Sequence, residues 1–513
     1  MSEQSVAQAV ALATRARAAM LAWRGATQAQ VDRVCEAMAR AGEAEAERLG
    51  RLAWEETGYG RPSHKTLKNV YCSRVLWESI RDIATCGVIA RDPVRKVIEI
   101  AEPAGVIAGL VPVTNPTSTV LFKSIITAKS RNAIVFAPHP RARRCIAETT
   151  RVMDEAAVSA GAPRDLVLSM TEVSLQGTEA LMRTPETKLI LATGSRAMVL
   201  AAYSSGKPTI AVGPGNHPAY VHSSVADVDR AAACVMASKV FDWGTACVSE
   251  QSAIADRAIA PSLRAAMERR GARFLTPAEQ DALLRAVFPK GPQGPYDVDC
   301  VSQSPATLAA LAGFDVPETT SLLVVQPGGI GPAHPFSREI LGPIFKWLEV
   351  DGAEQGIATA VAQVRFGGEG HTSSIHASDE AVIARYAAEI PTYRVLVNTP
   401  AIFGAPGFVT GLDVTFMIGT GFAGGSITGD NVGPRHLMNI KRVATATGTW
   451  DEPGVTPEEG RVAQWARDRI AGGGTAALAV AAAPGLAQEP RPDADASIEE
   501  LVRRAVEEVM SGG

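Results

Sequence analysis

The chain has 513 residues, a formal net charge of −4 at neutral pH, 46% hydrophobic residues and 20% charged residues. This length suggests about two to four domains and permits a large buried core. The nearly balanced charge argues against a nucleic-acid-binding surface, and the composition excludes wholesale disorder and a collagen-like repeat. The seven cysteines are scattered without a CxxC spacing, which favours free thiols in a reducing cytoplasm over a disulfide framework or a zinc ribbon.

Neither a membrane span nor a secretory signal is expected. The most apolar low-complexity stretch, Ala476–Ala483, is mostly alanine and too short to cross a bilayer. The N-terminal segment lacks a basic region followed by a compact apolar one. We therefore expect a cytoplasmic protein that binds neither membranes nor nucleic acid.

The first half of the chain predicts helices followed by alternating strands and helices. Apolar positions three and four apart predict helices from residue 5 to about 60. A strand is predicted at Val94–Ile100, and the apolar stretch Ala101–Val113 ends in the turn formers Asn115 and Pro116. Up to about residue 225 we expect strands at Ala133–Ala137, Leu166–Met170, Leu189–Ala192 and Thr209–Val212, and helices at Arg141–Ala160, Gln176–Arg183 and Ser195–Ser204. This alternation indicates parallel βαβ units in an open α/β sheet.

A second α/β region is predicted to begin with a helix at Asp227–Lys239. Its strands are expected near Val248–Ile254, Thr320–Val325, Phe345–Val350, Ser374–His376 and Val395–Val397. Gly and Pro are dense between Gly404 and Pro434, which indicates loops, and Ile440–Ala446 is predicted to form a further strand.

The C-terminal residues have a different composition. Residues 471–496 are rich in Ala, Gly, Pro and Asp, which is typical of a flexible linker. Residues 497–513 contain a predicted amphipathic helix that begins at capping-box spacing and carries an apolar face of Ile498, Leu501, Val502, Ala505, Val506 and Val509. Because so short a helix is marginal alone in water, this face needs a docking surface, on its own assembly or on a separate partner.

Cys247 is the first candidate for chemistry. It follows a Gly-Thr-Ala turn and precedes an apolar stretch, so its thiol can face a cleft. A thiolate there is a strong nucleophile if neighbouring dipoles lower its pKa. The alternative from local sequence is a buried and inert cysteine.

Two further segments can face a ligand. Asn115 ends an apolar strand, where its side-chain amide can donate a hydrogen bond to a developing oxyanion, although a simple Asn-Pro turn explains it too. In the segment PTIAVGPGNHPAY, Gly213 and Gly215 leave room for close approach to the backbone.

Two other patterns carry little weight. Gly419, Gly421 and Gly424 satisfy GxGxxG, but further glycines follow where the dinucleotide fingerprint needs a helix, so a loop is predicted. His371 and His376 have no clear third ligand beside them, and no metal site is expected.

Taken together, these segments resemble the aldehyde dehydrogenase superfamily, and more closely its CoA-acylating branch. That branch includes the aldehyde half of bifunctional aldehyde/alcohol dehydrogenases, acylating sulfoacetaldehyde dehydrogenases and aldehyde dehydrogenases of bacterial microcompartments. The matching stretches occur in family order from about residue 5 to 446: EPAGVIAGLVPVTNPTST, APHPRA, LATGS, VGPGN, FDWGTACVSEQS, REILGPI, GGEGHTSSIH and GFAGGSITGDNVGPRHL. Each motif is weak alone, but the ordered set is highly specific.

The resemblance implies roles for individual residues. Cys247 matches the nucleophile, and Asn115 matches the oxyanion-stabilising asparagine. Thr193, Gly194 and Ser195 match the turn that holds the cofactor pyrophosphate at a helix N-terminus. His139 and Pro140 fall where the adenosine ribose binds, and Glu339 matches the glutamate that anchors the nicotinamide ribose. His371 falls near the mouth of the active site, as a second-shell or CoA-side residue.

Val212 and Gly213 form the informative departure from the family. Hydrolytic aldehyde dehydrogenases carry a glutamate here, which activates the water that cleaves the acyl-enzyme. Without this base, hydrolysis should be slow, whereas a thiol such as CoA needs less help. The resemblance therefore implies oxidation of a short-chain aldehyde to acyl-CoA, unless another glutamate in the fold replaces the missing base.

The cofactor and the assembly are less defined. His139 replaces a lysine common in hydrolytic relatives and is followed by arginines at 141, 143 and 144, so NADP is open although NAD is favoured. The family pairs strands between subunits, which makes Val94–Ile100 and Ile440–Ala446 candidates for assembling a homodimer or homotetramer. The linker and terminal helix are similar to encapsulation peptides, which would bind a microcompartment shell protein through residues 497–513 and bring the enzyme into the lumen.

The resemblance also implies a domain division around a Rossmann-like fold. We expect a mainly cofactor-binding domain at 1–225 with an oligomerisation strand near 94–102, an α/β catalytic domain at 226–425, and a return to the cofactor and oligomerisation region at 426–470. The alternatives are a hydrolytic aldehyde dehydrogenase, a zinc-dependent histidinol dehydrogenase suggested by the GPGN segment, and a non-catalytic scaffold protein. A sulfoacetaldehyde substrate would need a cationic pocket, which the sequence does not locate.

Overall fold

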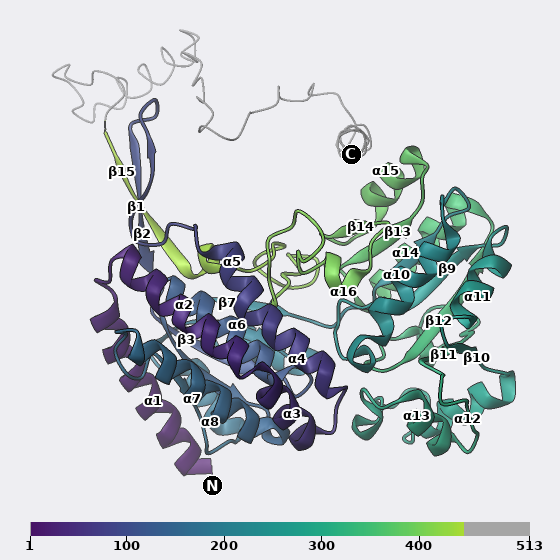
Figure 1. Ribbon diagram of the computed structural model, residues 1–513, viewed down its shortest axis with the longest axis horizontal. Helices are drawn as coiled ribbons and strands as arrows, with labels where there is room; N and C mark the ends of the chain where they lie inside the picture. The colour runs from purple at the N-terminus through teal and green to yellow at the C-terminus, as the bar shows by residue number, and fades with distance from the viewer. Residues whose placement is uncertain (1, 446–513) are drawn as a thin grey trace, which may run out of the picture.

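The computed structural model describes residues 2–445, and the predictions for residues 471–496 and 497–513 lie outside this part of the chain. The described residues form two α/β domains and a small three-stranded sheet that projects from the first domain (Figure 1). Within them, no helix has both the length and the apolar character that a membrane span requires. These α/β domains agree with the predicted fold class.

The predicted N-terminal helices are confirmed as α1 (Ser2–Trp23), α2 (Gln28–Ala44) and α3 (Ala46–Thr57). A capping box between Thr27 and Gln30 starts α2. Helix α4 (Pro62–Val70) begins with proline, which fits the first helical position because the N–H group there has no partner within the helix. The helix continues through a π-helical turn at Tyr71–Val75 into α5 (Leu76–Ile80). Because π-helical turns often occur at functional sites, this stretch is of interest for the candidate site.

The first domain is built on a five-stranded parallel sheet in the order β5-β4-β3-β6-β7. Its strands are β3 (Val106–Val111), β4 (Ala133–Pro138), β5 (Val167–Ser169), β6 (Thr187–Thr193) and β7 (Thr209–Val212). The connecting helices are α6 (Pro116–Lys129), α7 (Arg143–Ser159), α8 (Leu175–Arg183) and α9 (Arg196–Tyr203). The alternation predicted between residues 133 and 212 is confirmed, with boundaries shifted by at most a few residues.

Helix α6 had no counterpart in the sequence prediction. All of its residues are buried, because the helix lies in the centre of the first domain. A helix buried on every side lacks the polar face that makes amphipathic periodicity visible. Even Lys123 is buried, and its ammonium group donates to the carbonyls of Leu110 and Leu191 at 2.9 Å each.

The second domain is built on a seven-stranded parallel sheet in the order β10-β11-β12-β9-β8-β13-β14. Its strands are β8 (Pro218–Val221), β9 (Ser252–Asp256), β10 (Ala272–Phe274), β11 (Leu322–Val325), β12 (Ile344–Val350), β13 (Ser373–His376) and β14 (Val395–Val397). Its helices are α10 (Val228–Val240), α11 (Ala260–Glu268), α12 (Pro277–Val287), α13 (Pro305–Ala312), α14 (Gly352–Gly367), α15 (Glu380–Glu389) and α16 (Ala401–Gly404). Strand β8 lies before the expected boundary at residue 225, yet it pairs with β9 and β13 in this second sheet.

Two predicted strands differ from the structure. Val94–Ile100 is not one strand, because residues 93–96 form the turn between β1 (Gly87–Asp92) and β2 (Val97–Pro103). The Asp92 carboxylate closes this turn by accepting from the backbone N–H groups of Val94 and Arg95. The strand expected at Val248–Ile254 begins only at β9, since the preceding residues form a turn in which the Ser249 N–H donates to the Ala246 carbonyl at 3.1 Å.

The Gly- and Pro-rich segment is confirmed as irregular and lies between the two domains (Figure 1). The GxGxxG stretch at 419–424 forms turns and does not start a helix. The buried Arg394 guanidinium holds this segment by donating to the carbonyls of Gly419 and Gly429, and to the side chain of Asn431 at 3.0 Å. The chain then returns to the first domain, where β15 (Met438–Ala444) pairs antiparallel with β2.

We predict that the buried Asn132 stabilises the first domain through two long-range hydrogen bonds. Its Oδ1 accepts from the Gly105 N–H at 2.7 Å, and its Nδ2 donates to the Leu437 carbonyl at 2.8 Å. Asn132→Ala leaves two buried backbone groups without partners and should lower the free energy of unfolding by about 2–4 kcal/mol, as measured by urea denaturation. Asn439→Ala, at an exposed position of β15, is the matched control; equal stability of the two variants would contradict the prediction.

Candidate active site

Four strands of the first sheet end at one edge and bring predicted site residues together there. Val111 of β3 pairs with Pro138 of β4, and Thr193 of β6 pairs with Val212 of β7. Asn115 and His139 follow the ends of β3 and β4. In open α/β sheets, ligands bind in the crevice outside the carboxyl ends of the strands.

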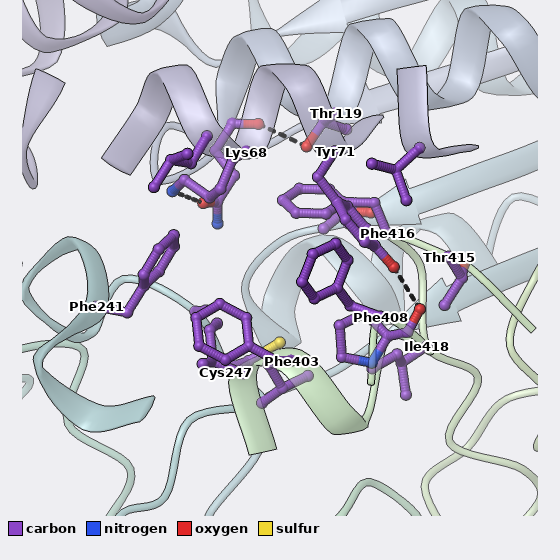
Figure 2. Close-up of a pocket in the computed structure, with 18 of the residues that line it drawn as sticks. Lys68, Tyr71, Thr119, Phe241, Cys247, Phe403, Phe408, Thr415, Phe416 and Ile418 are labelled. Carbon is purple, nitrogen blue, oxygen red and sulfur yellow. Dashed lines mark hydrogen bonds between the residues drawn. The ribbon is translucent and has the colours of Figure 1, made fainter. Parts of the chain in front are cut away.

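Cys247 lies opposite this edge, on the turn that precedes β9 of the second domain. Its thiol lines a cavity of about 370 Å³ between the domains, together with Asn115, Thr193 and Val212 (Figure 2). The structure thus brings the predicted nucleophile and the predicted oxyanion donor to one cavity. It also brings Val212, the position of the missing base, to the same wall.

The thiol has a histidine beside it. The His371 Nε2 lies 3.3 Å from the Cys247 Sγ. Burial, and then the nearby Glu339 carboxylate, raise the pKa of the Cys247 thiol to about 12. Burial, and then the positive Arg394, lower the pKa of His371 to about 3. At neutral pH the pair is therefore an uncharged thiol beside a neutral imidazole.

Gly215 makes this pair sterically feasible. An added Cβ at this position would lie 2.5 Å from the Cys247 carbonyl oxygen and 3.2 Å from the His371 ring. The expectation of close backbone approach is therefore met at Gly215. At Gly213 an added Cβ would meet no atom within 4 Å, so this part of the loop faces open space.

Asn115 is held by residues that the sequence did not indicate. The Lys68 ammonium group donates to the Asn115 Oδ1, and the Asn115 Nδ2 donates to the Thr114 Oγ1 at 3.2 Å. Lys68 also pairs with the buried Asp242, next to the Cys247 turn. With its oxygen engaged by Lys68 and one N–H by Thr114, the amide of Asn115 has one N–H left to present.

The charges in this cluster balance one another. Burial alone would raise the pKa of Asp242, but Lys68 and Lys65 bring it down to about 2. Burial lowers the pKa of Lys68 to about 8, against the opposing effect of Asp242. No sequence motif signals this cluster, because α4 and Asp242 are more than 170 residues apart in the chain.

Glu339 lies close to the Cys247 turn without lining the cavity. Its Oε1 accepts from the Gly215 N–H at 2.7 Å, and burial raises its pKa to about 7. The predicted cofactor-anchoring glutamate is therefore brought to the loop that follows β7. Among residues 2–445, no group of three His, Cys, Asp or Glu side chains is arranged to hold a metal ion.

The turn after β6 has features that suit a cofactor phosphate. The Thr193 Oγ1 is buried without a hydrogen-bond partner, and Ser195 caps α9 by accepting from the Met198 N–H. Gly194 connects them, and an added Cβ there would contact only the Met198 side chain at 3.6 Å. An unpaired hydroxyl at the start of a helix can donate to a pyrophosphate oxygen.

The segment after β4 contains an acidic neighbour that the sequence did not indicate. The His139 Nδ1 accepts from the Arg141 N–H, and Pro140 begins a short 3₁₀ turn. Glu56 of α3 then caps α7 by accepting from the N–H groups of Arg144 and Cys145, at 2.8 and 2.7 Å. The sequence predicted no acid near this position, because Glu56 comes from a distant helix.

Comparison with known proteins agrees with this site. The model of the aldehyde dehydrogenase family matches residues 1–281. The bifunctional aldehyde-alcohol dehydrogenase AdhE of Escherichia coli is 37% identical over 449 residues, which are 86% of this chain and 50% of that protein. The chain thus spans about half the length of this curated relative.

Two solved structures extend the comparison. An acetylating aldehyde dehydrogenase from Geobacillus thermoglucosidasius is 40% identical, with a TM-score of 0.86 over 88% of this chain and 99% of that one. The propionaldehyde dehydrogenase of Rhodopseudomonas palustris, solved with bound propionyl-CoA, is 26% identical, with a TM-score of 0.76 over 85% and 93%. Because the family model, the sequence identities and the fold all agree, the chain belongs to the aldehyde dehydrogenase family.

Proposed function

We propose that the protein oxidises a short-chain aldehyde to acyl-CoA with a nicotinamide cofactor, in a reversible reaction through a thioester on Cys247. The observation that carries this proposal is the composition of the cavity wall. Among residues 2–445, no carboxylate lines the cavity, and Val212 lies where hydrolytic family members carry their catalytic glutamate. A thioester formed there has no positioned base to activate water, so a thiol is the better acceptor.

The side chains supply the first chemical steps. The His371 Nε2, 3.3 Å from the sulfur, positions the Cys247 thiol, and the sulfur attacks the aldehyde carbonyl as the thiol proton passes to water. The Asn115 amide and the Cys247 N–H donate to the oxyanion that forms. A well-placed donor of this kind contributes roughly 3–4 kcal/mol to transition-state stabilisation. A bound nicotinamide would accept the hydride from the former aldehyde carbon. The acyl group left as a thioester on Cys247 then passes to the CoA sulfur, which regenerates the Cys247 thiol and gives ping-pong kinetics.

The edge of the first sheet is the proposed cofactor site. Thr193, Gly194 and Ser195 bind the pyrophosphate, His139 and Pro140 bind the adenosine ribose, and Glu339 binds the nicotinamide ribose. NAD is favoured over NADP, because Glu56 occupies the N-terminal N–H groups of α7 and adds a negative charge near the ribose position. A 2′-phosphate would be repelled by this carboxylate.

The hydrolytic alternative needs a glutamate from elsewhere in the fold. Glu339 and Glu250 are the candidates near Cys247, and burial raises the pKa of each to about 7. Both are engaged with backbone groups, Glu339 with the Gly215 N–H and Glu250 with the Ala401 N–H at 3.0 Å. Since neither lines the cavity, the acylating reaction is favoured.

Reduced-cofactor formation from propanal, with NAD or NADP and with or without CoA, tests the proposed reaction. We expect turnover to require CoA and to yield propionyl-CoA. Cys247→Ala should lower kcat by at least about 10³-fold, because the nucleophile is lost. Cys86→Ala is the matched control, since Cys86 is the other cysteine that is not fully buried. Accumulation of propionate at the same rate without CoA would contradict the proposal.

The pH dependence of thiol alkylation tests the uncharged Cys247–His371 pair. A pKa raised to about 12 means that the thiolate fraction in the free protein grows about tenfold per pH unit from pH 6 to 9. A pKa lowered to about 3 means that His371 stays neutral over the same range and adds no inflection. Iodoacetamide labelling of the Cys247 peptide, followed by mass spectrometry, should therefore rise without a plateau; a plateau at pH 6–8 would indicate a preformed thiolate.

In the turnover assay with propanal and CoA, His371→Ala should lower kcat by about 10²-fold, because the Cys247 thiol loses the imidazole that positions it. His222→Ala is the control, because His222 lies after β8 and does not line the cavity.

Assembly into a dimer or tetramer is proposed to use the projecting sheet. Strand β2 is paired on both sides, with β1 and β15, so strand pairing with another subunit falls to the edge strands. Val88 and Val443 on these edge strands are 43% and 47% exposed. The predicted oligomerisation role therefore suits Ile440–Ala446, which overlaps the edge strand β15, better than Val94–Ile100, which overlaps the central strand β2.

The terminal segment is proposed to bind a microcompartment shell protein, which would bring the enzyme from the cytoplasm into the lumen. Deleting residues 471–513 should leave kcat within about twofold, because the proposed catalytic residues lie before residue 445, and should abolish association with shell proteins in co-purification. Replacing Leu501 and Val502 with aspartate tests the apolar face at constant length, with Arg503→Lys and Arg504→Lys as the charge-preserving control. Unchanged co-purification of the deletion variant would refute the proposal.

A further inference from the structure

Five aromatic side chains line the cavity that contains the Cys247 sulfur. Figure 2 shows them facing one another across the cavity: Tyr71, Phe241, Phe403, Phe408 and Phe416. The Phe408 ring packs edge-on against Tyr71, with centroids 5.7 Å apart, and lies 6.0 Å from the Phe403 ring. Leucine, valine and isoleucine side chains fill the gaps between the rings. The part of the substrate beyond the carbonyl therefore meets apolar surface.

Apart from Asn115 and Thr193, which the proposed function assigns to the oxyanion and the cofactor, the hydroxyl groups of the wall are engaged with the protein itself. The Thr119 hydroxyl donates to the Asn115 carbonyl at 2.6 Å, and the Thr415 hydroxyl donates to the Val432 carbonyl at 2.7 Å. The Tyr71 hydroxyl donates to the Pro406 carbonyl, as Figure 2 shows. Each donor thus has a backbone partner, and none of the three is left for a charged substrate tail.

Lys68 is the single cationic side chain on the cavity wall within residues 2–445, and its charge is already balanced. It pairs with Asp242 and donates to Asn115. Arg394, behind His371, is buried and donates to the carbonyls of Gly419 and Gly429. With Asn115 and Thr193 assigned to the oxyanion and the cofactor, an anionic group on the substrate chain would therefore lose its hydration without gaining a charged partner.

We propose that the substrate carries an uncharged, apolar chain beyond its carbonyl, and that the cavity excludes aldehydes that end in a carboxylate or sulfonate. This inference rests on the proposed function and adds the chemical class of its substrate. The cavity volume of about 370 Å³ also leaves room beyond a three-carbon chain. Each further buried methylene group should raise kcat/KM by about fourfold, until the cavity is filled.

Pairs of aldehydes that differ only in charge test the proposal. Butanal and succinate semialdehyde have four carbons each and differ by the terminal carboxylate; propanal and sulfoacetaldehyde form a second pair. With CoA and NAD present, we expect kcat/KM for butanal to exceed that for succinate semialdehyde by at least about 100-fold. We also expect kcat/KM to rise from propanal to butanal and from butanal to pentanal. Equal values within the charge-differing pair, or a preference for either anion, would overturn the proposal.

A variant of the cavity wall separates apolar recognition from the chemical step. Phe408→Ala removes one aromatic wall and should lower kcat/KM for pentanal by about tenfold, with a much smaller effect for propanal. Phe422→Ala is the matched control, because Phe422 lies in the same irregular segment, is 86% exposed and does not line the cavity. If Phe408→Ala lowered kcat/KM for pentanal and for propanal by the same factor, the aromatic wall would not select for chain length.

A binding measurement distinguishes failure of this inference from failure of the proposed function. The Cys247→Ala variant cannot form the thiohemiacetal, so saturation-transfer NMR on it reports the cavity alone. Signal transfer to butanal and none to succinate semialdehyde would support the inference even if no CoA-dependent turnover were found. Equal transfer to both would overturn it, whatever the reaction proves to be.

Discussion

A single buried carboxylate, Asp242, joins the two domains at the point where the site is formed. It is fully buried, and Lys65 and Lys68 of α4 in the first domain pair with it directly. Its backbone has a left-handed φ of 49°, and its Oδ1 accepts from the Arg61 N–H at 2.6 Å. Removing one partner of such a buried pair typically costs about 3–5 kcal/mol, because the remaining charge is left in a dry interior. This cluster therefore fixes α4 against the Cys247 turn.

The same cluster positions the proposed chemistry. Lys68 bonds to both Asp242 and the Asn115 oxygen. The proposed oxyanion donor of the first domain is therefore held in a fixed position relative to the proposed nucleophile of the second domain. Behind the thiol, the neutral His371 and the close approach of Gly215 enclose Cys247. Within residues 2–445, Lys68 is the only charged side chain that lines the cavity, and most of the other lining residues are apolar. A dry site strengthens each remaining dipole that acts on the reacting carbonyl.

Local patterns predicted some of this arrangement well. The alternation of strands and helices between residues 133 and 212 was readable, since each strand is short and apolar and each helix keeps a polar face. Helix α6 was not readable, because it is buried on every side. At the β1–β2 hairpin, β1 was not predicted, and the strand predicted at Val94–Ile100 included part of the turn. The turn signal Asp92-Pro93 was overlooked there, and the turn ends at Lys96, which has a left-handed φ.

Sequence by itself determined the fold class, the family, and the identity of Cys247, Asn115 and Glu339 as candidates, because ordered short motifs carry that information along the chain. Tertiary structure alone decided that His371 touches Cys247, that Lys68 and Asp242 hold Asn115, and that Glu56 caps α7. It also decided that five aromatic rings meet in one cavity. The reason is physical: these contacts join residues tens to hundreds of positions apart, and burial shifts their pKa values only once the chain has folded around them.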